Sequence, residues 1–316
     1  MVKIAVGQLE PVWFDLEATV SKTIKYIEEA SYEGAELVAF PEVFIPGYPL
    51  YIWERATEFV KNVKYIKNSL SVDSPEFRRI QDAAQANAIV VVIGFSENEN
   101  GSLFISQAII EKSGEVKLKR RKCKATHVER VMYGDGNAET LKGVTPIEFS
   151  SGTYNVGCLN CWEHTQQLLN YYNATLNEDI HIGGWPPMFD QDEAPGVLYS
   201  LRKEGARSLA SAYAIQNSCY YLFATGLISE EINKEIDPLP DMFNYGGGCA
   251  AIFAPDGSII SESLDPHVEG LIYANVDRDR LTLNRHLLHT VGHYSRPDLL
   301  SLQVNNSNSS IVTFKE

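Results

Sequence analysis

The segment around Cys161 has the residue type and the setting that a nucleophilic cysteine needs. Asn160-Cys161-Trp162-Glu163-His164 follows an apolar run that predicts a strand and precedes a stretch that predicts a helix. A thiolate at such a position is stabilised by the amino terminus of the helix and is held at a sharp, exposed turn. Because cysteine thiolates attack electrophilic carbon and form covalent intermediates, the segment predicts a catalytic cysteine.

Three other interpretations of Cys161 remain open on these residues. Cys158 and Cys161 form a Cys-x-x-Cys pair that could be a redox dithiol or part of a zinc site, although no second cysteine pair or histidine cluster lies near it in the sequence. His164 could activate Cys161 if the two side chains share one helical turn. Cysteine is also often a small buried hydrophobic residue without a chemical role.

Glu42 is the candidate general base. Phe40-Pro41-Glu42 ends an apolar run that predicts a buried strand, and α/β folds build their sites at the carboxyl ends of strands. The next segment, Ile45-Pro46-Gly47-Tyr48-Pro49, predicts a rigid loop that could hold the Tyr48 ring beside Glu42. The alternatives are an exposed glutamate without a role and an ordinary structural turn.

A basic run contains the candidate catalytic lysine. Five of the 27 Lys and Arg residues fall within residues 119–124 of a chain that is acidic as a whole. Such a run usually forms a solvated face. Because side chains alternate along a strand, Lys122 should point away from Arg121 and Cys123, so that one cation can face a site while its neighbours face water.

Apolar β-branched runs alternate with helical patterns along the chain, as in β–α–β units. The predicted strands span residues 2–9, 37–40, 89–95, 103–110, 116–122, 154–159, 180–183, 219–224, 249–254, 258–261 and 270–276. The predicted helices span residues 16–30, 76–87, 163–172 and 197–216. Asp15 is the expected N-cap of the first helix, and Gly34 is expected to end it.

These elements predict a single α/β domain over residues 1–300. The chain has 316 residues, of which 44% are hydrophobic and 22% charged, which is typical of a globular protein with a sizeable core. No internal repeat and no linker rich in Pro, Gly and Ser divides it. Residues 301–316 include a polar segment of low complexity and are predicted to form a partly disordered C-terminal tail.

The net charge of -14 disfavours several classes of partner, because it repels nucleic-acid phosphates and anionic membrane surfaces. The first ten residues are too polar for a signal segment, and no later stretch reaches the roughly 18 apolar residues of a membrane span. Five cysteines at irregular spacing disfavour a disulfide framework. A cytoplasmic protein is therefore predicted.

Taken together, the motifs resemble those of the nitrilase superfamily, and specifically of its nitrilase branch. The segments that carry the resemblance are Phe40-Pro41-Glu42, Ile45-Pro46-Gly47-Tyr48-Pro49, Arg121-Lys122, Thr126-His127-Val128-Glu129-Arg130, Tyr133-Gly134-Asp135-Gly136 and Asn160-Cys161-Trp162-Glu163-His164. The resemblance continues through residues 181–186, 255–257 and 292–298, so it covers nearly the whole chain.

The resemblance implies a single-domain αββα sandwich that dimerises, with no metal and no organic cofactor. It also implies a Glu–Lys–Cys triad in which Cys161 attacks and Glu42 is the general base and acid. Lys122 would stabilise developing negative charge together with the Trp162 backbone N–H. Glu129, the second glutamate, would orient the lysine and the substrate.

Two positions depart from the usual pattern of the family. Cys123 stands where leucine is usual, and Ala125 stands where proline is usual. Because proline restricts the backbone, the loop after Lys122 is expected to be less rigid than in the family.

The activity that the resemblance implies is hydrolysis of a small nitrile to a carboxylic acid and ammonia, through a thioimidate and then a thioester on the cysteine. Met188 and Phe189 are expected in an apolar pocket wall. The predicted substrate-binding residues are Tyr48, Trp162, His164 and Trp185.

Several other functions remain as alternatives. A cyanide hydratase would release an amide, and it usually has asparagine at the position of His164. An amidase of the same superfamily is the next alternative, followed by a catalytically silent binding protein and a redox dithiol protein. The resemblance further implies a homodimer or a larger homo-oligomer, such as a spiral.

Overall fold

The computed structural model describes residues 1–190, 192–193, 195–231 and 235–307. Its strands are β1 (Val2–Leu9), β2 (Leu37–Ala39), β3 (Val90–Glu99), β4 (Ser102–Ile110), β5 (Val116–Arg121), β6 (Tyr133–Gly134), β7 (Val144–Phe149), β8 (Gly152–Asn160), β9 (Ile180–Trp185), β10 (Tyr220–Gly226), β11 (Ala251–Phe253) and β12 (Gly270–Val276). Its α-helices are α1 (Leu16–Tyr32), α2 (Ile52–Arg55), α3 (Phe59–Asn68), α4 (Pro75–Ala86), α5 (Gln167–Thr175), α6 (Lys203–Asn217) and α7 (Arg278–Leu287). Short 3-10 segments are η1 (His127–Val131), η2 (Ala138–Thr140), η3 (Cys161–Thr165) and η4 (Tyr199–Leu201).

The strands form two layers that are hydrogen-bonded to each other at one corner. The strand order is β5-β4-β3-β2-β1-β10-β9-β8-β7, with β12 beside β1, β11 beside β10 and β6 beside β4. The junction is short, because β1 and β10 pair only at Gln8 with Thr225 and at Leu9 with Gly226. This short junction lets the two halves of the sheet face each other.

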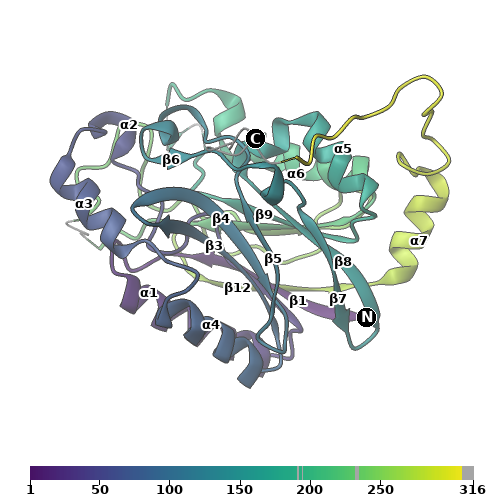
Figure 1. The fold of residues 1–316 in the computed structure, drawn as a ribbon, viewed down its shortest axis with the longest axis horizontal. Helices are drawn as coiled ribbons and strands as arrows, with labels where there is room; N and C mark the ends of the chain where they lie inside the picture. Colours follow the sequence, from purple (N-terminus) through teal and green to yellow (C-terminus); the bar gives the residue numbers. More distant parts are fainter. Residues whose placement is uncertain (191, 194, 232–234, 308–316) are drawn as a thin grey trace, which may run out of the picture.

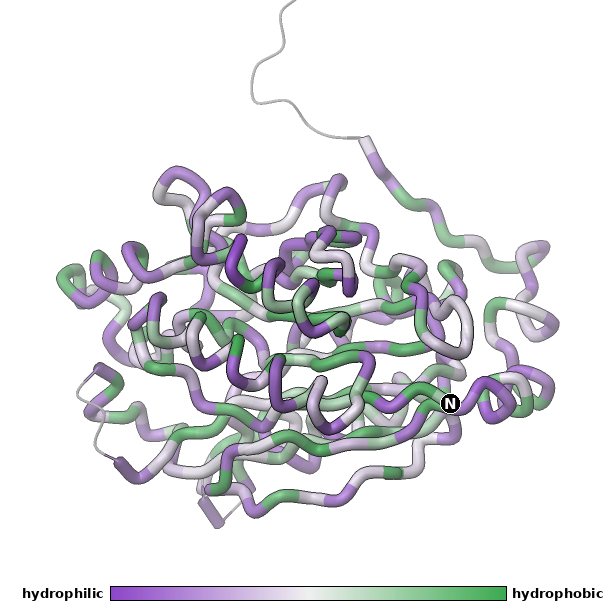
Figure 2. The backbone as a smooth tube through the Cα atoms, turned by 90° about the horizontal axis from the view of Figure 1, so that it is seen from below, coloured by the Kyte–Doolittle hydropathy of each residue, from purple (hydrophilic) through white to green (hydrophobic). Residues whose placement is uncertain are grey.

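The main hydrophobic core lies between these two layers. Val6 of β1 and Val92 of β3 belong to the same buried cluster as Val156 of β8 and Leu222 of β10. Apolar side chains on both faces of the inner strands explain why their sequences are almost continuously hydrophobic. Figure 2 shows this pattern as hydrophobic stretches along the central strands.

Helices cover the two outer faces. On one side, Ile27 of α1 and Ile80 of α4 pack against the sheet that contains β3. On the other side, Ala210 of α6 and Leu169 of α5 pack against a cluster that includes Phe223 of β10. Figure 1 shows the α1 and α4 pair below the strands and the α5 and α6 pair above them. The predicted single-domain αββα sandwich is confirmed.

The first helix begins and ends as its sequence predicts. The Asp15 side chain accepts a hydrogen bond from the backbone N–H of Ala18, which satisfies one of the free donors of the first turn. The helix ends before Gly34, whose φ of 79° lies in the left-handed region that glycine adopts without strain.

Several predicted elements differ from the structure. The strand predicted at 258–261 is wrong, because that segment makes only an isolated bridge between Phe253 and Ile259. The helix predicted at 163–172 is divided into η3 and α5, and the helix predicted at 197–216 into η4 and α6. The sequence patterns do not predict α2, α3, α7, β6 or β7.

The last described residues, 301–307, are mostly exposed. Residues 301–307 contain no helix or strand, and the rest of the predicted tail, 308–316, lies outside the described residues. None of the described helices is both long enough and apolar enough to span a bilayer.

Candidate active site

Lys122 connects the two candidate catalytic glutamates. Its Nζ donates hydrogen bonds to Glu42 Oε1 at 2.8 Å and to Glu129 Oε2 at 2.9 Å. The Cys161 thiol lies within the electrostatic influence of all three charged groups. All four residues are buried. The structure therefore brings together the four residues that the motifs indicate.

Three of these residues are positioned by the carboxyl ends of strands from both halves of the sandwich, and Glu129 lies in η1. Glu42 follows β2, Lys122 follows β5 and Cys161 follows β8. Lys122 is held in place by its backbone N–H, which donates to the carbonyl of Ile105 on β4 at 2.7 Å. The site thus forms at the strand ends, where α/β folds place their functional groups.

Cys161 has an unusual backbone conformation. Its φ of 44° lies in the left-handed region, which costs a non-glycine residue on the order of 1–3 kcal/mol. The predicted exposed turn at an α-helix terminus is wrong, because Cys161 is only 6% exposed and begins a five-residue 3-10 helix. Such strain persists where surrounding contacts hold a functional residue in place.

The two cysteines of the Cys-x-x-Cys pair enter different parts of the interior. Cys158 belongs to the core between the two sheet layers, whereas Cys161 belongs to the cluster beneath α6. All five cysteines are free thiols. This separation argues against a dithiol formed by Cys158 and Cys161.

The protonation states of the site suit a nucleophile with a partner base. Burial raises the pKa of Cys161 well above its ordinary value, and Glu42 adds to the rise while Lys122 opposes it. The thiol is therefore neutral at physiological pH and must lose its proton as it attacks. Burial also raises the pKa of Glu42 to about 8, although Lys122 opposes this rise.

Glu42 also has an oxygen available for proton transfer. Glu42 Oε2 is buried and has no hydrogen-bond partner among the described residues. A carboxyl group with a pKa near the working pH and a free oxygen can accept a proton and return it.

The Lys122 ammonium stays charged in the buried site. Burial by itself lowers the pKa of Lys122, but Glu129 and Glu42 hold this pKa above its ordinary value.

Glu129 is fixed by three neighbours. Besides Lys122, its carboxylate accepts from the Tyr48 hydroxyl at 2.9 Å and from the Thr126 backbone N–H at 2.7 Å. The Trp53 indole N–H in turn donates to the Tyr48 hydroxyl at 3.3 Å. Because each of its oxygens accepts a hydrogen bond, the Glu129 carboxylate is held in one position.

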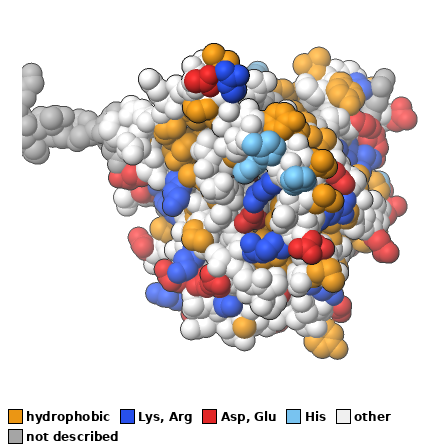
Figure 3. All heavy atoms as spheres, turned by 90° about the vertical axis from the view of Figure 1, so that its right-hand side faces the viewer, with side chains coloured by type: hydrophobic (Ala, Val, Ile, Leu, Met, Phe, Trp, Pro, Cys, Tyr) orange, Lys and Arg blue, Asp and Glu red, His pale blue; other side chains and the backbone are white. Residues whose placement is uncertain are grey.

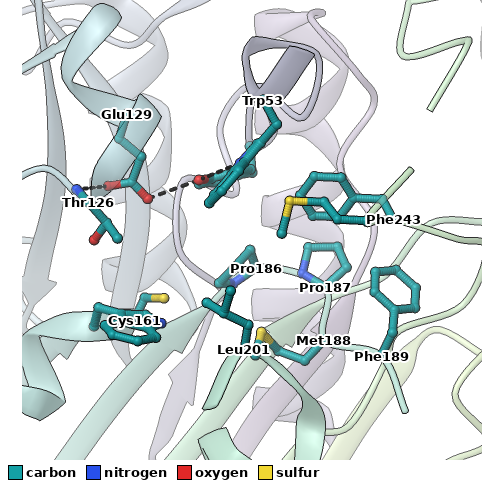
Figure 4. Close-up of a pocket in the computed structure, with 13 residues that line it drawn as sticks. Trp53, Thr126, Glu129, Cys161, Pro186, Pro187, Met188, Phe189, Leu201 and Phe243 are labelled. Carbon is teal, nitrogen blue, oxygen red and sulfur yellow. Dashed lines mark hydrogen bonds between the residues drawn. The ribbon is translucent and has the colours of Figure 1, made fainter. Parts of the chain in front are cut away.

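A largely apolar pocket opens beside Cys161 and Glu129 (Figure 4). Figure 4 shows Cys161 and Glu129 on one side of it, and Phe243 and Phe189 on the other. Four of the residues predicted around the pocket line it: Tyr48, Trp162, Met188 and Phe189. The other lining residues are Trp53, Thr126, Glu129, Cys161, Pro186, Pro187, Leu201, Met242 and Phe243.

His164 and Trp185 do not line this pocket. The two rings stack on each other with centroids 5.2 Å apart, and Trp185 also stacks on Phe223 of β10. Both are buried in the layer beneath α6, with Trp185 fully inaccessible. Their placement differs from the predicted substrate contact because they point toward this helix layer.

The sequence matches the carbon-nitrogen hydrolase family over residues 3–285. This chain belongs to the carbon-nitrogen hydrolase family. It is 47% identical to a nitrilase from Meyerozyma guilliermondii over 99% of both chains. It is 46% identical to an arylacetonitrilase from Hypocrea virens, over 99% of this chain and 94% of that relative. The resemblance drawn from the motifs is confirmed at the level of the family.

The fold agrees with this membership. A solved amidase from Nesterenkonia sp. superposes with a TM-score of 0.64 over 91% of this chain and 96% of that one. Because the two sequences are only 18% identical, this likeness concerns the fold alone. In the described part of the chain, no group of three or more His, Cys, Asp or Glu side chains could hold a metal ion.

A second buried ion pair supports the site of this carbon-nitrogen hydrolase. The Arg120 guanidinium donates to both oxygens of Glu163, at 2.6 and 2.7 Å. Glu163 also accepts from the backbone N–H groups of Cys123 and Asn160, at 2.8 and 2.9 Å. It therefore ties the turn that carries Cys161 to the strand that leads to Lys122.

The basic run differs from its prediction. The sequence indicated one inward cation with solvated neighbours, but Arg120, Arg121 and Lys122 are all buried. Each has a carboxylate partner: Arg120 pairs with Glu163, Arg121 with Glu97, and Lys122 with the two glutamates of the site. Alternation along the strand indicates which way a side chain points, but it cannot reveal a partner from a distant segment.

Replacing Glu163 with glutamine should destabilise the protein in a pH-dependent way. Burial alone would raise its pKa, but Arg120 and backbone N–H groups lower it from 4.5 to about 2. Its stabilising contribution is therefore present above about pH 4.5 and is lost as the pH falls toward about 2. At neutral pH, we expect Glu163→Gln to lower the free energy of unfolding by about 3–5 kcal/mol, because Arg120 keeps an unpaired buried charge.

Urea unfolding at about pH 7 and about pH 3 measures this difference. The matched control is the double variant Arg120→Met/Glu163→Gln, which should recover part of the lost stability because no charge is left unpaired. Equal destabilisation by Glu163→Gln at both pH values would contradict the assignment of the ion pair.

The loop after Lys122 is held by hydrogen bonds. The backbone N–H of Ala125 donates to Asp135 Oδ1 at 3.2 Å, and its carbonyl accepts from Arg130 Nε at 3.0 Å. Proline lacks an N–H and could not make the first of these bonds. Ala125 thus provides a constraint on this loop that differs from that of the family's proline.

Proposed function

We propose that this carbon-nitrogen hydrolase is a nitrilase that converts an aryl-bearing nitrile to the carboxylic acid and ammonia. The single observation that supports this most strongly is the buried Lys122, hydrogen-bonded to Glu42 and Glu129 beside the Cys161 thiol. The aromatic pocket residues Trp53, Phe189 and Phe243 suit an aryl group, and relatives at 46–47% identity are called nitrilase and arylacetonitrilase.

In the first step, Cys161 Sγ attacks the nitrile carbon. The thiol proton passes to Glu42 Oε2 and from there to the nitrile nitrogen. An S–H bond and one carbon–nitrogen π bond break, while an S–C bond and an N–H bond form, and the product is a thioimidate. The Lys122 ammonium and the Trp162 backbone N–H stabilise the negative charge that develops at the reacting centre.

In the following steps, two water molecules are consumed. Glu42 takes a proton from the first water as it adds to the thioimidate carbon, and the resulting tetrahedral centre receives that proton on nitrogen. The hydroxyl proton of this centre then passes through Glu42 to the nitrogen, the C–N bond breaks, and ammonia leaves as the thioester carbonyl forms. A second water, activated in the same way, releases the carboxylic acid and restores the Cys161 thiol. One nitrile and two waters therefore give one acid and one ammonia.

The product depends on which bond of the tetrahedral centre breaks. Loss of ammonia leads to acid, whereas loss of the Cys161 thiolate leads to amide. The negative charge of Glu129 favours protonated nitrogen as the leaving group. A barrier difference of about 1.4 kcal/mol changes the ratio of the two products roughly tenfold. Small changes at this residue can therefore shift the product.

We expect Glu129→Gln to lower the rate and to raise the amide fraction, because glutamine keeps the shape of the side chain but not its charge. Chromatographic quantitation of acid and amide from one arylacetonitrile measures the ratio. Tyr48→Phe is the matched control, since it removes the hydrogen bond to Glu129 and leaves the carboxylate charge. An unchanged amide fraction in Glu129→Gln, or an equal rise in Tyr48→Phe, would contradict the role of the charge.

A substrate panel tests the proposed function against its alternatives. The purified protein is supplied with arylacetonitriles, benzonitriles, dinitriles, hydrogen cyanide and the matching amides, and ammonia, acid and amide are measured. Acid and ammonia from arylacetonitriles are expected. Amide as the main product from cyanide would indicate a hydratase, and turnover of amides without nitriles would indicate an amidase.

We also propose that the protein is a cytoplasmic homodimer or larger homo-oligomer. For the compartment, irregularly spaced free cysteines suit a reducing environment.

Exposed leucines support the proposed oligomer. Leu168 of α5 and Leu299 and Leu300 line one groove and are 71%, 67% and 83% exposed. Figure 3, which faces the α7 end, shows hydrophobic side chains grouped between charged ones. Such patches often mark interfaces, and sedimentation showing an active monomer would contradict the proposal.

A further inference from the structure

A chain of buried hydrogen bonds leads from Glu178 to the backbone of Cys161, and the proposed reaction does not use it. His164 Nδ1 lies 2.6 Å from the Cys161 carbonyl oxygen. His164 Nε2 lies 2.9 Å from His181 Nε2, and His181 Nδ1 lies 2.7 Å from Glu178 Oε1. All three side chains are at least nine-tenths buried. His164 lies in η3, His181 lies in β9 and Glu178 shortly precedes β9, so the hydrogen bonds connect these three segments.

The carbonyl at one end fixes the direction of these bonds. A carbonyl oxygen only accepts, so His164 carries its proton on Nδ1 and donates to Cys161. In the neutral ring, His164 Nε2 is then an acceptor, and His181 must donate to it from Nε2. His181 Nδ1 is in turn an acceptor, so Glu178 donates as a neutral carboxylic acid. Every donor in the chain points toward the nucleophile.

The surroundings suit this uncharged arrangement. Burial lowers the pKa of His164 and His181 well below their ordinary values. Burial raises the pKa of Glu178 to about 8. Charged groups near the chain are Arg120, Glu163, Asp179 and Arg285. At neutral pH the carboxyl group can therefore keep its proton, and neither ring needs to carry a charge in the interior.

Tyrosines complete the hydrogen bonding of the chain. The Tyr213 hydroxyl donates to Glu178 Oε2 at 2.7 Å. The Tyr221 hydroxyl accepts from Trp185 Nε1 at 2.9 Å and lies 2.8 Å from His164 Nε2, where it shares the acceptor with His181. These contacts fix both ends of the chain in a polar network that has no access to solvent.

Two glycines on neighbouring strands make room for this network. A Cβ at Gly157 of β8 would lie 1.8 Å from Glu178 Oε1, and a Cβ at Gly183 of β9 would lie 1.9 Å from the Tyr221 hydroxyl. Any side chain at either position would therefore displace a polar group of the network. The strands are shaped to admit the hydrogen-bonded groups, which argues against a chance cluster of buried polar residues.

We propose that Glu178, His181 and His164 form a positioning chain for the nucleophile. The Nδ1–H of His164 holds the Cys161 carbonyl and thereby the left-handed backbone from which the thiol faces the site. This role rests on Cys161 being the nucleophile of the proposed function. None of the three side chains lines the pocket, so they act through the backbone of Cys161 and do not contact substrate.

Matched substitutions test the direction of the hydrogen bonds. In Glu178→Gln, the amide can donate to His181 Nδ1 while its oxygen accepts from Tyr213, so the chain is kept. Glu178→Leu removes the donor in a similar volume. His164→Asn can keep a donor near the Nδ1 position, whereas His164→Leu cannot.

Two readouts are measured for each variant: the rate at which iodoacetamide alkylates Cys161, followed by peptide mass mapping, and kcat and KM for an arylacetonitrile. Each leucine variant should slow alkylation and lower kcat by about tenfold or more, with KM nearly unchanged. Glu178→Gln should keep both values within about threefold of the wild type. His164→Asn should retain more activity and reactivity than His164→Leu.

Tyr220→Phe is the control for loss of stability, because the Tyr220 hydroxyl bonds to Asp277 outside the chain. It should lower the thermal midpoint and leave Cys161 alkylation unchanged. Leucine variants as reactive as the wild type would overturn the proposal. If the leucine variants do not fold, a loss of Cys161 reactivity in folded Glu178→Gln would still overturn it. Alkylation of Cys161 can be measured without a nitrile. If the variants show the expected order of alkylation rates but the wild type does not turn over nitriles, the positioning chain stands and only the proposed substrate is overturned.

Discussion

Replacing Cys161 with alanine should reduce nitrile turnover by about 10⁴-fold or more, because the attacking atom is removed and no covalent intermediate can form. The change from thiol to methyl is small, so the fold should persist. Activity is measured as ammonia release, and folding as circular dichroism and the thermal midpoint. Retained turnover in a folded Cys161→Ala protein would contradict the mechanism.

Cys158→Ala is the matched control for this experiment. Cys158 lies in the core between the sheet layers, so its loss should cost stability through packing and leave the chemistry intact. A comparable loss of turnover in both variants, at equal thermal stability, would instead support a dithiol formed by the two cysteines.

Replacing Glu42 with glutamine should lower kcat/KM by about 10²–10⁴-fold, because the amide cannot take the thiol proton or return it to nitrogen. The pH dependence distinguishes this role from a structural one. Burial raises the pKa of Glu42 to about 8, so the fraction of carboxylate grows as the pH rises toward that value. In the wild type, kcat/KM should rise over this range.

The Glu42→Gln variant should lose this rise, because its side chain does not titrate. Measurement of kcat/KM against pH for both proteins, with thermal midpoints at each pH, tests the assignment. A variant that keeps the wild-type pH profile at lower amplitude would show that another group is the base.

The sequence is informative about three of the four catalytic residues, Glu42, Lys122 and Cys161, because each lies at the end of a recognisable strand, whereas Glu129 lies in η1. Glu42 follows the apolar run that forms β2, and Cys161 follows the one that forms β8. Hydrophobic periodicity places such residues at strand ends, but it does not indicate which ends meet. The resemblance of the motifs supplied the expectation that Glu42, Lys122, Glu129 and Cys161 converge.

The supporting residues could not be predicted because their partners lie far away in the sequence. Arg120 and Glu163 are 43 positions apart, and nothing in the basic run indicates a bidentate pair. Trp53 and Phe243 come from segments outside the motifs, yet both line the pocket and their rings pack edge to face with centroids 6.2 Å apart. Such contacts depend on how loops pack over the sandwich, which local patterns do not encode.

The positions of His164 and Trp185 show a related limit. Aromatic residues in a motif beside a nucleophile suggest contact with substrate, but these two rings pack beneath α6. The orientation of Trp185 depends on the register of β9 with β10, which places it opposite Thr225. Register is determined by the assembled sheet and cannot be derived from residue types alone.

The helix α3 could not be predicted for another reason. Its apolar residues Phe59 and Val60 are exposed, so its sequence does not show the buried apolar face that predicts a helix.

During turnover, Cys161 should form a covalent intermediate with the nitrile. Rapid acid quenching of the wild-type protein while it turns over an arylacetonitrile, followed by intact-protein and peptide mass spectrometry, would detect this intermediate. A thioimidate or thioester adduct is expected on the peptide that contains Cys161, and no such adduct is expected in the Cys161→Ala variant. Covalent catalysis by Cys161 would be contradicted if the wild type turned over the nitrile with the adduct on another residue and the Cys161→Ala variant stayed active.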